Sequence, residues 1–213
     1  MPEFGPRTLS NPIYWDGNGG FAAYNTGANS LTLTGGVTLT SNREIWVNYP
    51  QIVTFAGGIG EALGSYYFHK RGIGIMELAA PATHSGATYI ENSGALILRD
   101  QGVLANTSFV EPRFGSTLQI DNTGLYLSDR IRDLANINLR AGSVVYIGAP
   151  GQASSETLWD LNIAGYTQYG QTVLTRVSTA PGSSVALNFN SINTNNQQNI
   201  LNFVGQGAEI GSA

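Results

Sequence analysis

The chain has no cysteine, so disulfide bonds contribute nothing to its stability. Charge is also scarce: Asp, Glu, Lys and Arg make up 11% of the 213 residues, against about 25% in ordinary globular proteins. Lys70 is the single lysine, and the formal net charge is −4. A nucleic-acid surface needs clustered positive charge to contact phosphates, so nucleic acid is not expected as a partner.

Long apolar runs are missing as well. No run approaches the roughly 20 residues that a membrane helix needs, so we expect no membrane insertion by this segment. The N-terminus lacks the apolar region of a signal peptide, and any secretion signal is expected upstream. Residues 1–7 are predicted to be a cloning-derived or disordered tail. Disorder of the whole chain is disfavoured, because 42% of the residues are hydrophobic and 10% are aromatic.

Helix signals are nearly absent, and short alternating runs stand in their place. Between Lys70 and Leu98 the runs 73–78, 88–90 and 96–98 alternate apolar and polar residues, with Gly, Pro, Ser and Asn between them. Alternation with a period of two places one set of side chains on each face of a strand. Each run is too short to be stable alone, so the chain is predicted to wind into a coil in which each run pairs with the run one turn away.

This stretch resembles the autotransporter-associated β-strand repeat of bacterial passenger domains and giant surface proteins. The matching positions are Lys70, Gly72, Gly74, Met76, Leu78, Ser85, Gly86, Thr88, Ile90, Gly94, Leu96 and Leu98. Ala82 and His84 depart from the pattern, since they fall near its usual Asn and Tyr. The resemblance implies a passenger-type stalk or adhesin at the bacterial cell surface, and it brings no catalytic residues.

Alternating runs continue on both sides of this stretch, from Leu31 to Phe203. The sequence therefore predicts an all-β fold, a single right-handed parallel β-helix of roughly nine rungs with about 20–25 residues each. Residues 8–29 are predicted to cap its N-terminal end, and residues 30–213 to form the helix, which is expected to be truncated from a longer protein. The densest charge lies in residues 127–133, which resemble a turn of the same family leading into a strand at 137–139.

Several segments contain residue types that could bind a metal ion or a phosphate. Asp16 and Asn18 resemble the start of a calcium loop, but its later ligands are missing, and a tight turn is favoured. Residues 57–64 approximate a glycine-rich phosphate loop with the wrong spacing, and a turn between rungs is the better interpretation. His69 and His84 would need a carboxylate to form a metal site; packing is favoured for both. Residues 193–199 (NTNNQQN) form either an excursion loop or a stacked amide ladder. No metal and no cofactor are expected.

Catalysis is not expected either. The acidic residues form no recognisable pair or motif for glycoside cleavage, and a single lysine makes a lyase improbable. There is no G-x-S-x-G element. Neighbouring rungs could still bring two carboxylates together, which keeps a carbohydrate-cleaving β-helix open as an alternative.

Aromatic residues that are expected to be exposed are the candidate contact residues. They could stack on sugar rings or contact a partner, or they could close rungs and form ladders, which is the favoured reading. The candidates are Trp46, Tyr49, Tyr66, Tyr67 and Trp159.

The predicted function is that of a non-enzymatic structural or adhesive rod of a secreted or surface-displayed bacterial protein. The expected partners are a host or neighbouring-cell surface, a glycan, or copies of the chain itself stacked end to end. A phage or virion fibre segment and a carbohydrate-binding or carbohydrate-cleaving β-helix are the alternatives.

Overall fold

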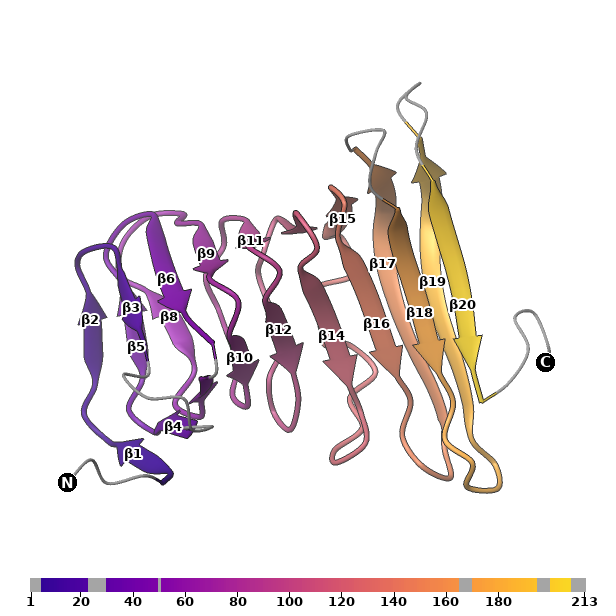
Figure 1. Cartoon of the computed structure of the whole chain (residues 1–213), viewed down its shortest axis with the longest axis horizontal. Helices are drawn as coiled ribbons and strands as arrows, with labels where there is room; N and C mark the ends of the chain where they lie inside the picture. The colour runs from indigo at the N-terminus through magenta and orange to yellow at the C-terminus, as the bar shows by residue number, and fades with distance from the viewer. Residues whose placement is uncertain (1–4, 23–29, 50, 165–169, 195–199, 208–213) are drawn as a thin grey trace.

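The computed structural model describes residues 5–22, 30–49, 51–164, 170–194 and 200–207, and these ranges contain strands and turns but no helix. The strands form three parallel sheets in which neighbours follow the order of the chain (Figure 1). The nine-stranded sheet consists of β1 (Arg7–Leu9), β4 (Ser30–Leu33), β7 (Ile52–Phe55), β10 (Ile75–Leu78), β12 (Ala95–Leu98), β14 (Thr117–Asp121), β16 (Ser143–Ile147), β18 (Gln171–Arg176) and β20 (Leu201–Gln206).

Two further sheets form the other sides. The eight-stranded sheet consists of β3 (Gly19–Phe21), β6 (Arg43–Val47), β9 (Phe68–Arg71), β11 (Thr88–Ile90), β13 (Phe109–Pro112), β15 (Asn136–Leu139), β17 (Ala153–Ile163) and β19 (Ser184–Asn193). The three-stranded sheet consists of β2 (Ile13–Trp15), β5 (Val37–Leu39) and β8 (Ile59–Glu61). The predicted parallel β-helix of about nine rungs is confirmed, because the longest sheet has nine strands.

Side chains that point inwards stack in register from one coil to the next. One row of the nine-stranded sheet consists of Leu33, Phe55, Leu78, Leu98, Ile120 and Tyr146, all completely buried. Burial of an apolar side chain of this size stabilises the fold by about 1.5–3 kcal/mol. Such rows, repeated on each sheet, give the chain a continuous core without disulfide bonds.

The third side of the coil continues beyond β8 as single paired residues. Ile59 pairs with Ala82, which is followed by Leu104 and Ile131. The first three of these inward residues donate their N–H to a main-chain carbonyl of the next coil: Ile59 to Pro81, Ala82 to Val103 and Leu104 to Arg130. The prediction that residues 57–64 form only a turn is therefore wrong, since Ile59 points into the core and belongs to β8.

The coils lengthen towards the C-terminus. Thr54 and Glu77, which are partners in β7 and β10, lie 23 residues apart, whereas Asp160 and Ser191, partners in β17 and β19, lie 31 apart. The last coils thus exceed the predicted length. Their extra residues extend the strands, and β17 and β19 have 11 and 10 residues.

The segment predicted as an N-terminal cap contributes strands to the first coil. β2 pairs with β5 and β3 pairs with β6, and Trp15 packs against the core beside Phe21. Nothing in the structure decides where a cap would end, so that boundary stays a prediction. Residues 1–4 of the predicted tail and 195–199 of the polar stretch lie outside the described residues.

Candidate functional site

Charged and aromatic side chains gather on the outer face of the eight-stranded sheet, where strand register aligns them in two rows. The first row consists of Glu44, His69, Tyr89 and Glu111. The second row lies two residues further along each coil and consists of Trp46, Arg71, Glu91, Arg113 and Arg140. We call these nine residues the charged face.

Ion pairs on the charged face connect successive coils. The Nη2 atom of Arg71 lies 3.3 Å from Glu44 Oε1 and 3.2 Å from Glu91 Oε2. Further along, the Glu111 carboxylate accepts from Arg113 and lies 3.1 Å from Arg140 Nε. Three carboxylates therefore meet three guanidinium groups, and the charged face has no net charge when His69 is neutral.

Aromatic rings on this face are covered by the same guanidinium groups. Tyr89 packs edge-on between Tyr67 and Phe109, with ring centroids 5.6 Å and 5.5 Å away. Arg113 lies over the Tyr89 ring at 4.4 Å, and Arg71 lies over the Trp46 ring at 5.4 Å. Because cation–π contacts occupy these ring faces, a sugar could stack on them only by displacing an arginine.

His69 is uncharged at neutral pH. Its Nε2 atom lies 3.0 Å from Glu91 Oε2, but no aligned hydrogen bond joins them. Burial lowers the pKa of His69 to about 4, and the neighbouring Arg71 acts in the same direction. His69 therefore packs within the ion-pair network as a neutral ring and takes no part in its charge balance.

The five predicted contact residues do not form one platform. Trp46 and Tyr67 lie on the outer side of the eight-stranded sheet beneath or beside other side chains. Tyr49 is 71% exposed in the loop after β6, while Tyr66 packs against the core and donates its hydroxyl to the Leu63 carbonyl. Trp159 is 45% exposed on β17, several coils away.

A second polar region lies on the outer side of β15, β17 (the strand of Trp159) and β19, and consists mainly of uncharged amides. Asn162 donates from Nδ2 to Asn138 Oδ1 at 2.9 Å, and Asn193 donates to Asn162 Oδ1 at 3.0 Å, which makes a ladder across β15, β17 and β19. Beside it, the Asp160 carboxylate accepts from Asn190 and Ser191 at 3.0 and 2.8 Å. An amide ladder was predicted only for residues 193–199, and the structure shows Asn193 at the end of one.

Buried polar groups tie the coils together from inside. The Glu156 carboxylate accepts from the backbone N–H of Arg130 at 3.1 Å and of Ile131 at 2.9 Å. It therefore takes the place that a main-chain carbonyl occupies in the preceding coils. Burial raises the pKa of Glu156 to about 8, although the two N–H donors oppose that shift.

Lys70 is another buried charged residue in the middle coils. Its ammonium donates to the carbonyls of Gly72 and Gly74 at 2.5 and 2.6 Å, and the side chain is completely buried. Burial lowers the pKa of Lys70 to about 8. The lysine that begins the predicted repeat thus closes the corner between β9 and β10.

His84 belongs to a buried hydrogen-bond chain whose direction can be derived. The Thr107 hydroxyl lies 3.0 and 3.1 Å from the Gly86 and Phe109 carbonyls and donates to one of them, so it accepts from Thr88 Oγ1 at 3.0 Å. Thr88 in turn accepts from His84 Nε2 at 2.8 Å. The hydrogen therefore sits on Nε2, and Nδ1 is buried without a partner.

Acid is expected to destabilise the protein through these histidines. Burial lowers the pKa of His84 from 6.5 to about 4, opposed only by the Glu61 carboxylate. As the pH falls from 6.5 towards 4, the unfolded chain binds a proton that the folded chain does not, so the free energy of unfolding decreases. The loss from His84 is up to about 3 kcal/mol, and His69 titrates in the same window.

The variant His84→Gln isolates this contribution. It should lower the free energy of unfolding at pH 7 but flatten its decline between pH 6.5 and 4, as measured by urea unfolding. Glu156 acts in the opposite sense: its raised pKa gives stability that is complete below pH 4.5 and lost as the pH rises through 8. Glu156 is present in both the parent protein and His84→Gln. If the free energy of unfolding falls equally steeply with pH in the two proteins, His84 does not titrate as described.

The described part of the chain meets the requirements of neither a metal site nor a membrane-spanning helix. There, no three His, Cys, Asp or Glu side chains group as metal ligands would. The same residues include no helix that is long and apolar enough to cross a bilayer. Asp16 binds Arg43 and Thr40, and Asn18 accepts from the Glu44 N–H, so both serve contacts between the first two coils.

Sequence patterns missed Tyr89, Arg113, Arg130 and Glu156. Tyr89 and Arg113 become neighbours only when two coils are placed in register. The alternation within 88–90 does, however, predict that Tyr89 faces outwards. Arg130 and Glu156 lie where no alternation shows which side faces inwards.

The stacked parallel sheets and side-chain ladders define the chain as a parallel β-solenoid. No family model matches it, and neither does any curated protein or solved structure.

Proposed function

We propose that the chain is a non-enzymatic, rigid rod of a secreted or surface-displayed bacterial protein, which holds a binding surface at a distance. The supporting observation is that polar side chains bridge successive coils on the outside and in the core alike. Arg71 and Arg140 bridge coils outside, and Arg130 and Glu156 do so inside. Such cross-coil contacts resist bending and shear between coils. Surface display rests on the repeat resemblance of residues 70–98.

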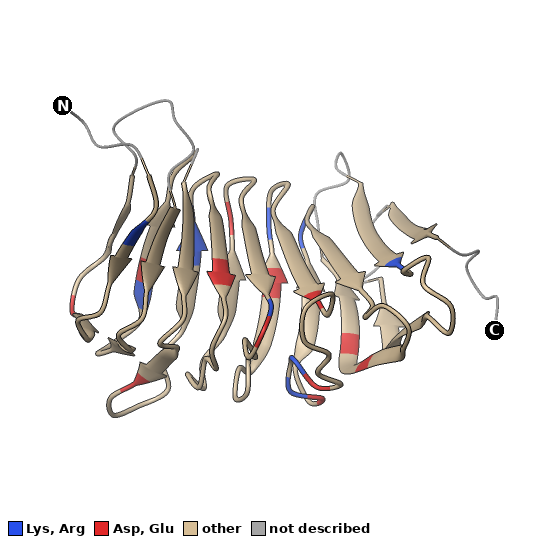
Figure 2. Cartoon of the chain, turned by 90° about the horizontal axis from the view of Figure 1, so that it is seen from below, with Lys and Arg blue, Asp and Glu red and all other residues tan. Residues whose placement is uncertain are grey.

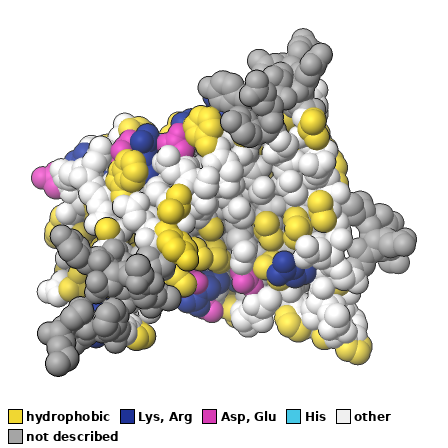
Figure 3. All heavy atoms as spheres, viewed as in Figure 1, with side chains coloured by type: hydrophobic (Ala, Val, Ile, Leu, Met, Phe, Trp, Pro, Cys, Tyr) yellow, Lys and Arg dark blue, Asp and Glu magenta, His cyan; other side chains and the backbone are white. Residues whose placement is uncertain are grey.

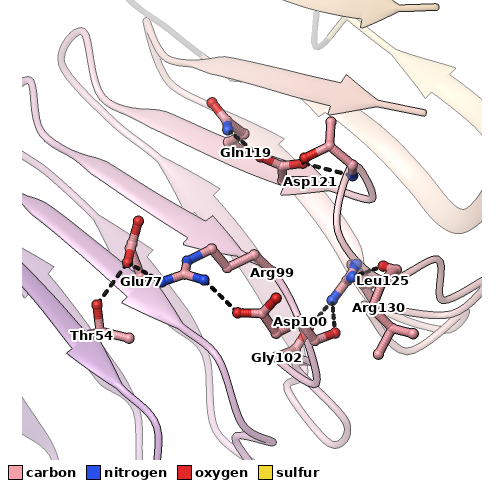
Figure 4. A network of polar contacts seen from close by, with 10 residues as sticks. Thr54, Glu77, Arg99, Asp100, Gly102, Gln119, Asp121, Leu125 and Arg130 are labelled. Atoms are coloured by element: carbon pink, nitrogen blue, oxygen red, sulfur yellow. Dashed lines mark hydrogen bonds and ion pairs between the residues drawn. The ribbon is translucent and has the colours of Figure 1, made fainter. Parts of the chain in front are cut away.

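A non-enzymatic role is supported by the hydrogen bonds that the carboxylates of Glu77 and Glu61 accept from other residues. Glu77 accepts from Thr54 and Arg99 at 2.7 and 2.8 Å (Figure 4), and Glu61 accepts from Ser85 and the Tyr66 N–H. A general acid or base must exchange protons with a substrate, so it needs a free face. These carboxylates use their oxygens to fasten neighbouring coils instead.

Solution scattering tests the rod. Nine strands at a spacing of about 4.8 Å give a length on the order of 40 Å. We expect light scattering on a sizing column to show a monomer of 22.6 kDa, and small-angle X-ray scattering to fit the elongated coil. A profile that the stacked coil does not fit, or one that shows independently moving halves, would contradict a rigid rod.

End-to-end assembly is a second candidate, supported by the last coil. The inward-facing residues Val185, Leu187 and Phe189 are only partly buried, and Phe203 is 48% exposed, unlike their buried counterparts in earlier coils. A first coil of another copy could pair with the outer edges of β19 and β20. Filaments that lengthen with protein concentration would support assembly, and a constant monomer mass up to millimolar protein would exclude it.

A further inference from the structure

Charge is distributed unevenly along the rod. After Asp160 the only charged residues are Arg176 and Glu209. In Figure 2 red and blue segments recur along the earlier coils, whereas the last strands are almost entirely tan. Figure 3, which views the molecule from the side of the nine-stranded sheet, likewise shows charged side chains in small groups, with uncharged side chains and backbone covering most of the C-terminal part of that side. The two ends of the rod therefore offer different chemistry to a partner.

Trp159 lies on β17 at the start of this charge-poor part, where the register with β19 passes from Leu158 to Asp160 and gives Trp159 no partner. Leu158 and Leu161 are buried, so the two residues between them, Trp159 and Asp160, both lie on the outer side. The backbone N–H of Trp159 donates to the Ala135 carbonyl at 3.2 Å, which fixes the main chain beneath the ring. Within the described ranges no other ring and no guanidinium group packs on this indole, in contrast to Trp15 and Trp46.

The asparagine side chains on these strands are held in place by hydrogen bonds but keep some donors and acceptors without a partner in the protein. Each asparagine side chain has two N–H donors and a carbonyl that accepts twice. The ladder from Asn138 through Asn162 to Asn193 uses one donor and one acceptor per contact, and Asn193 gives its second donor to Ser191 Oγ at 3.1 Å and keeps its carbonyl as an acceptor. Asn190 uses one donor on Asp160 and is otherwise exposed. The surface thus presents oriented donors and acceptors on three adjacent strands.

Sugar chains require this combination. The C–H face of a sugar ring packs on an aromatic ring, while its hydroxyls need both donors and acceptors. An anionic ligand would need positive charge, but the guanidinium that follows β15, that of Arg140, is already engaged by Glu111. Arg132 and Asp133, both exposed in the turn before β15, carry opposite charges. On β17 the Asp160 carboxylate accepts from Asn190 and Ser191, which matches a neutral ligand better than a cationic one.

We propose that the outer surface of β15, β17 and β19 binds an uncharged oligosaccharide or polysaccharide. Trp159 is the stacking platform, and Asn138, Asn162, Asn190 and Asn193 supply the hydrogen bonds. This assignment deepens the adhesive role proposed above and rests on it, because the rod keeps the three strands in register. The ladder runs across the strands, so a linear glycan would lie along the rod and contact several coils.

The test uses the intact chain and a defined panel of saccharides. Cello-, xylo-, chito- and malto-hexaose are the neutral probes, and polygalacturonate and heparin are the anionic ones. We expect at least one neutral hexaose to change the tryptophan fluorescence saturably and to be detected independently by calorimetry. Trp159→Ala should weaken that binding at least tenfold, and Asn162→Ala should weaken it measurably. The matched control Trp46→Ala removes a tryptophan that Arg71 covers, and it should leave affinity unchanged.

Circular dichroism and thermal unfolding of each variant show whether the coil is intact. If Trp159→Ala does not fold, Asn162→Ala and Asn193→Ala carry the test, since both lie on the exposed ladder. The proposal is overturned if no neutral saccharide binds, if only the anionic polymers bind, or if binding is insensitive to all three changes. X-ray scattering on the same sample separates the two proposals, because a rigid monomeric rod that binds no glycan leaves the structural role standing.

Discussion

Replacing Arg130 by Met is expected to remove most of the stability of the folded chain. The Arg130 side chain is completely buried, and its guanidinium donates to the carbonyls of Asp100 and Gly102 in the preceding coil, at 3.0 and 2.8 Å (Figure 4). Within its own coil it donates to the Leu125 carbonyl at 2.5 Å and to Asn122 Oδ1 at 2.6 Å. One side chain thus satisfies four acceptors in two coils.

Methionine preserves much of the volume but donates no hydrogen bond. Each acceptor left buried and unpaired costs about 1–3 kcal/mol. The substitution leaves four such acceptors, against a total stability of about 5–15 kcal/mol for a natural protein. We therefore expect the free energy of unfolding to decrease by about 4 kcal/mol or more in urea titrations at pH 7.

Two further variants show whether the hydrogen bonds are the cause. Arg132 lies two residues away on the exposed side of the same turn, so Arg132→Met should change the stability by less than about 0.5 kcal/mol. Arg130→Lys retains the charge but lacks the planar fork that reaches both coils, and should fall between the two. A loss below 1 kcal/mol in Arg130→Met would mean that the carbonyls find other donors.

The importance of Arg130 could not be read from the sequence, although the fold could. Alternation shows which side of a strand faces inwards, so runs such as 88–90 and 96–98 predicted β11 and β12 directly. Residues 127–133 were correctly placed in a turn before a strand, since β15 begins at Asn136. A turn has no period, however, and which of its charged residues points inwards depends on how the coil closes.

The charged face was hidden for a related reason. Tyr67 could be recognised as a candidate contact residue, but its neighbour Tyr89 lies one coil further on. Which residues become neighbours depends on the number of residues in each corner, and this number differs from coil to coil. Trp159 was one of the candidate contact residues and is exposed, whereas the amides on the same side of the sheet come from three coils that only the register brings together.

Replacing Gly94 by Ala is expected to disrupt the middle coils, because the space for a methyl group is already filled. A Cβ atom at this position would lie 1.8 Å from Lys70 Nζ and 2.2 Å from the Gly72 carbonyl oxygen. Lys70 cannot withdraw without abandoning its two carbonyl acceptors inside the core, and the Gly72 oxygen is main chain. Either β12 must move away from β10 or the ammonium must lose its partners.

Overpacking of this kind costs about 1–3 kcal/mol and occasionally more, and the forced displacement of a buried ammonium places Gly94→Ala at about 3 kcal/mol or above. The control is Gly60→Ala in β8, where the nearest atom, Thr83 Oγ1, would lie 3.8 Å from the new methyl group; its cost should stay within about 1 kcal/mol. Lys70 provides a second readout, because it is the only lysine and is fully buried. An amine-reactive ester at pH 8 should leave Lys70 unlabelled in the parent protein and in Gly60→Ala, but label it in Gly94→Ala. Parent-like stability together with an unlabelled Lys70 would show that the corner accommodates a methyl group, and that the packing of Lys70 against Gly94 is looser than the structure indicates.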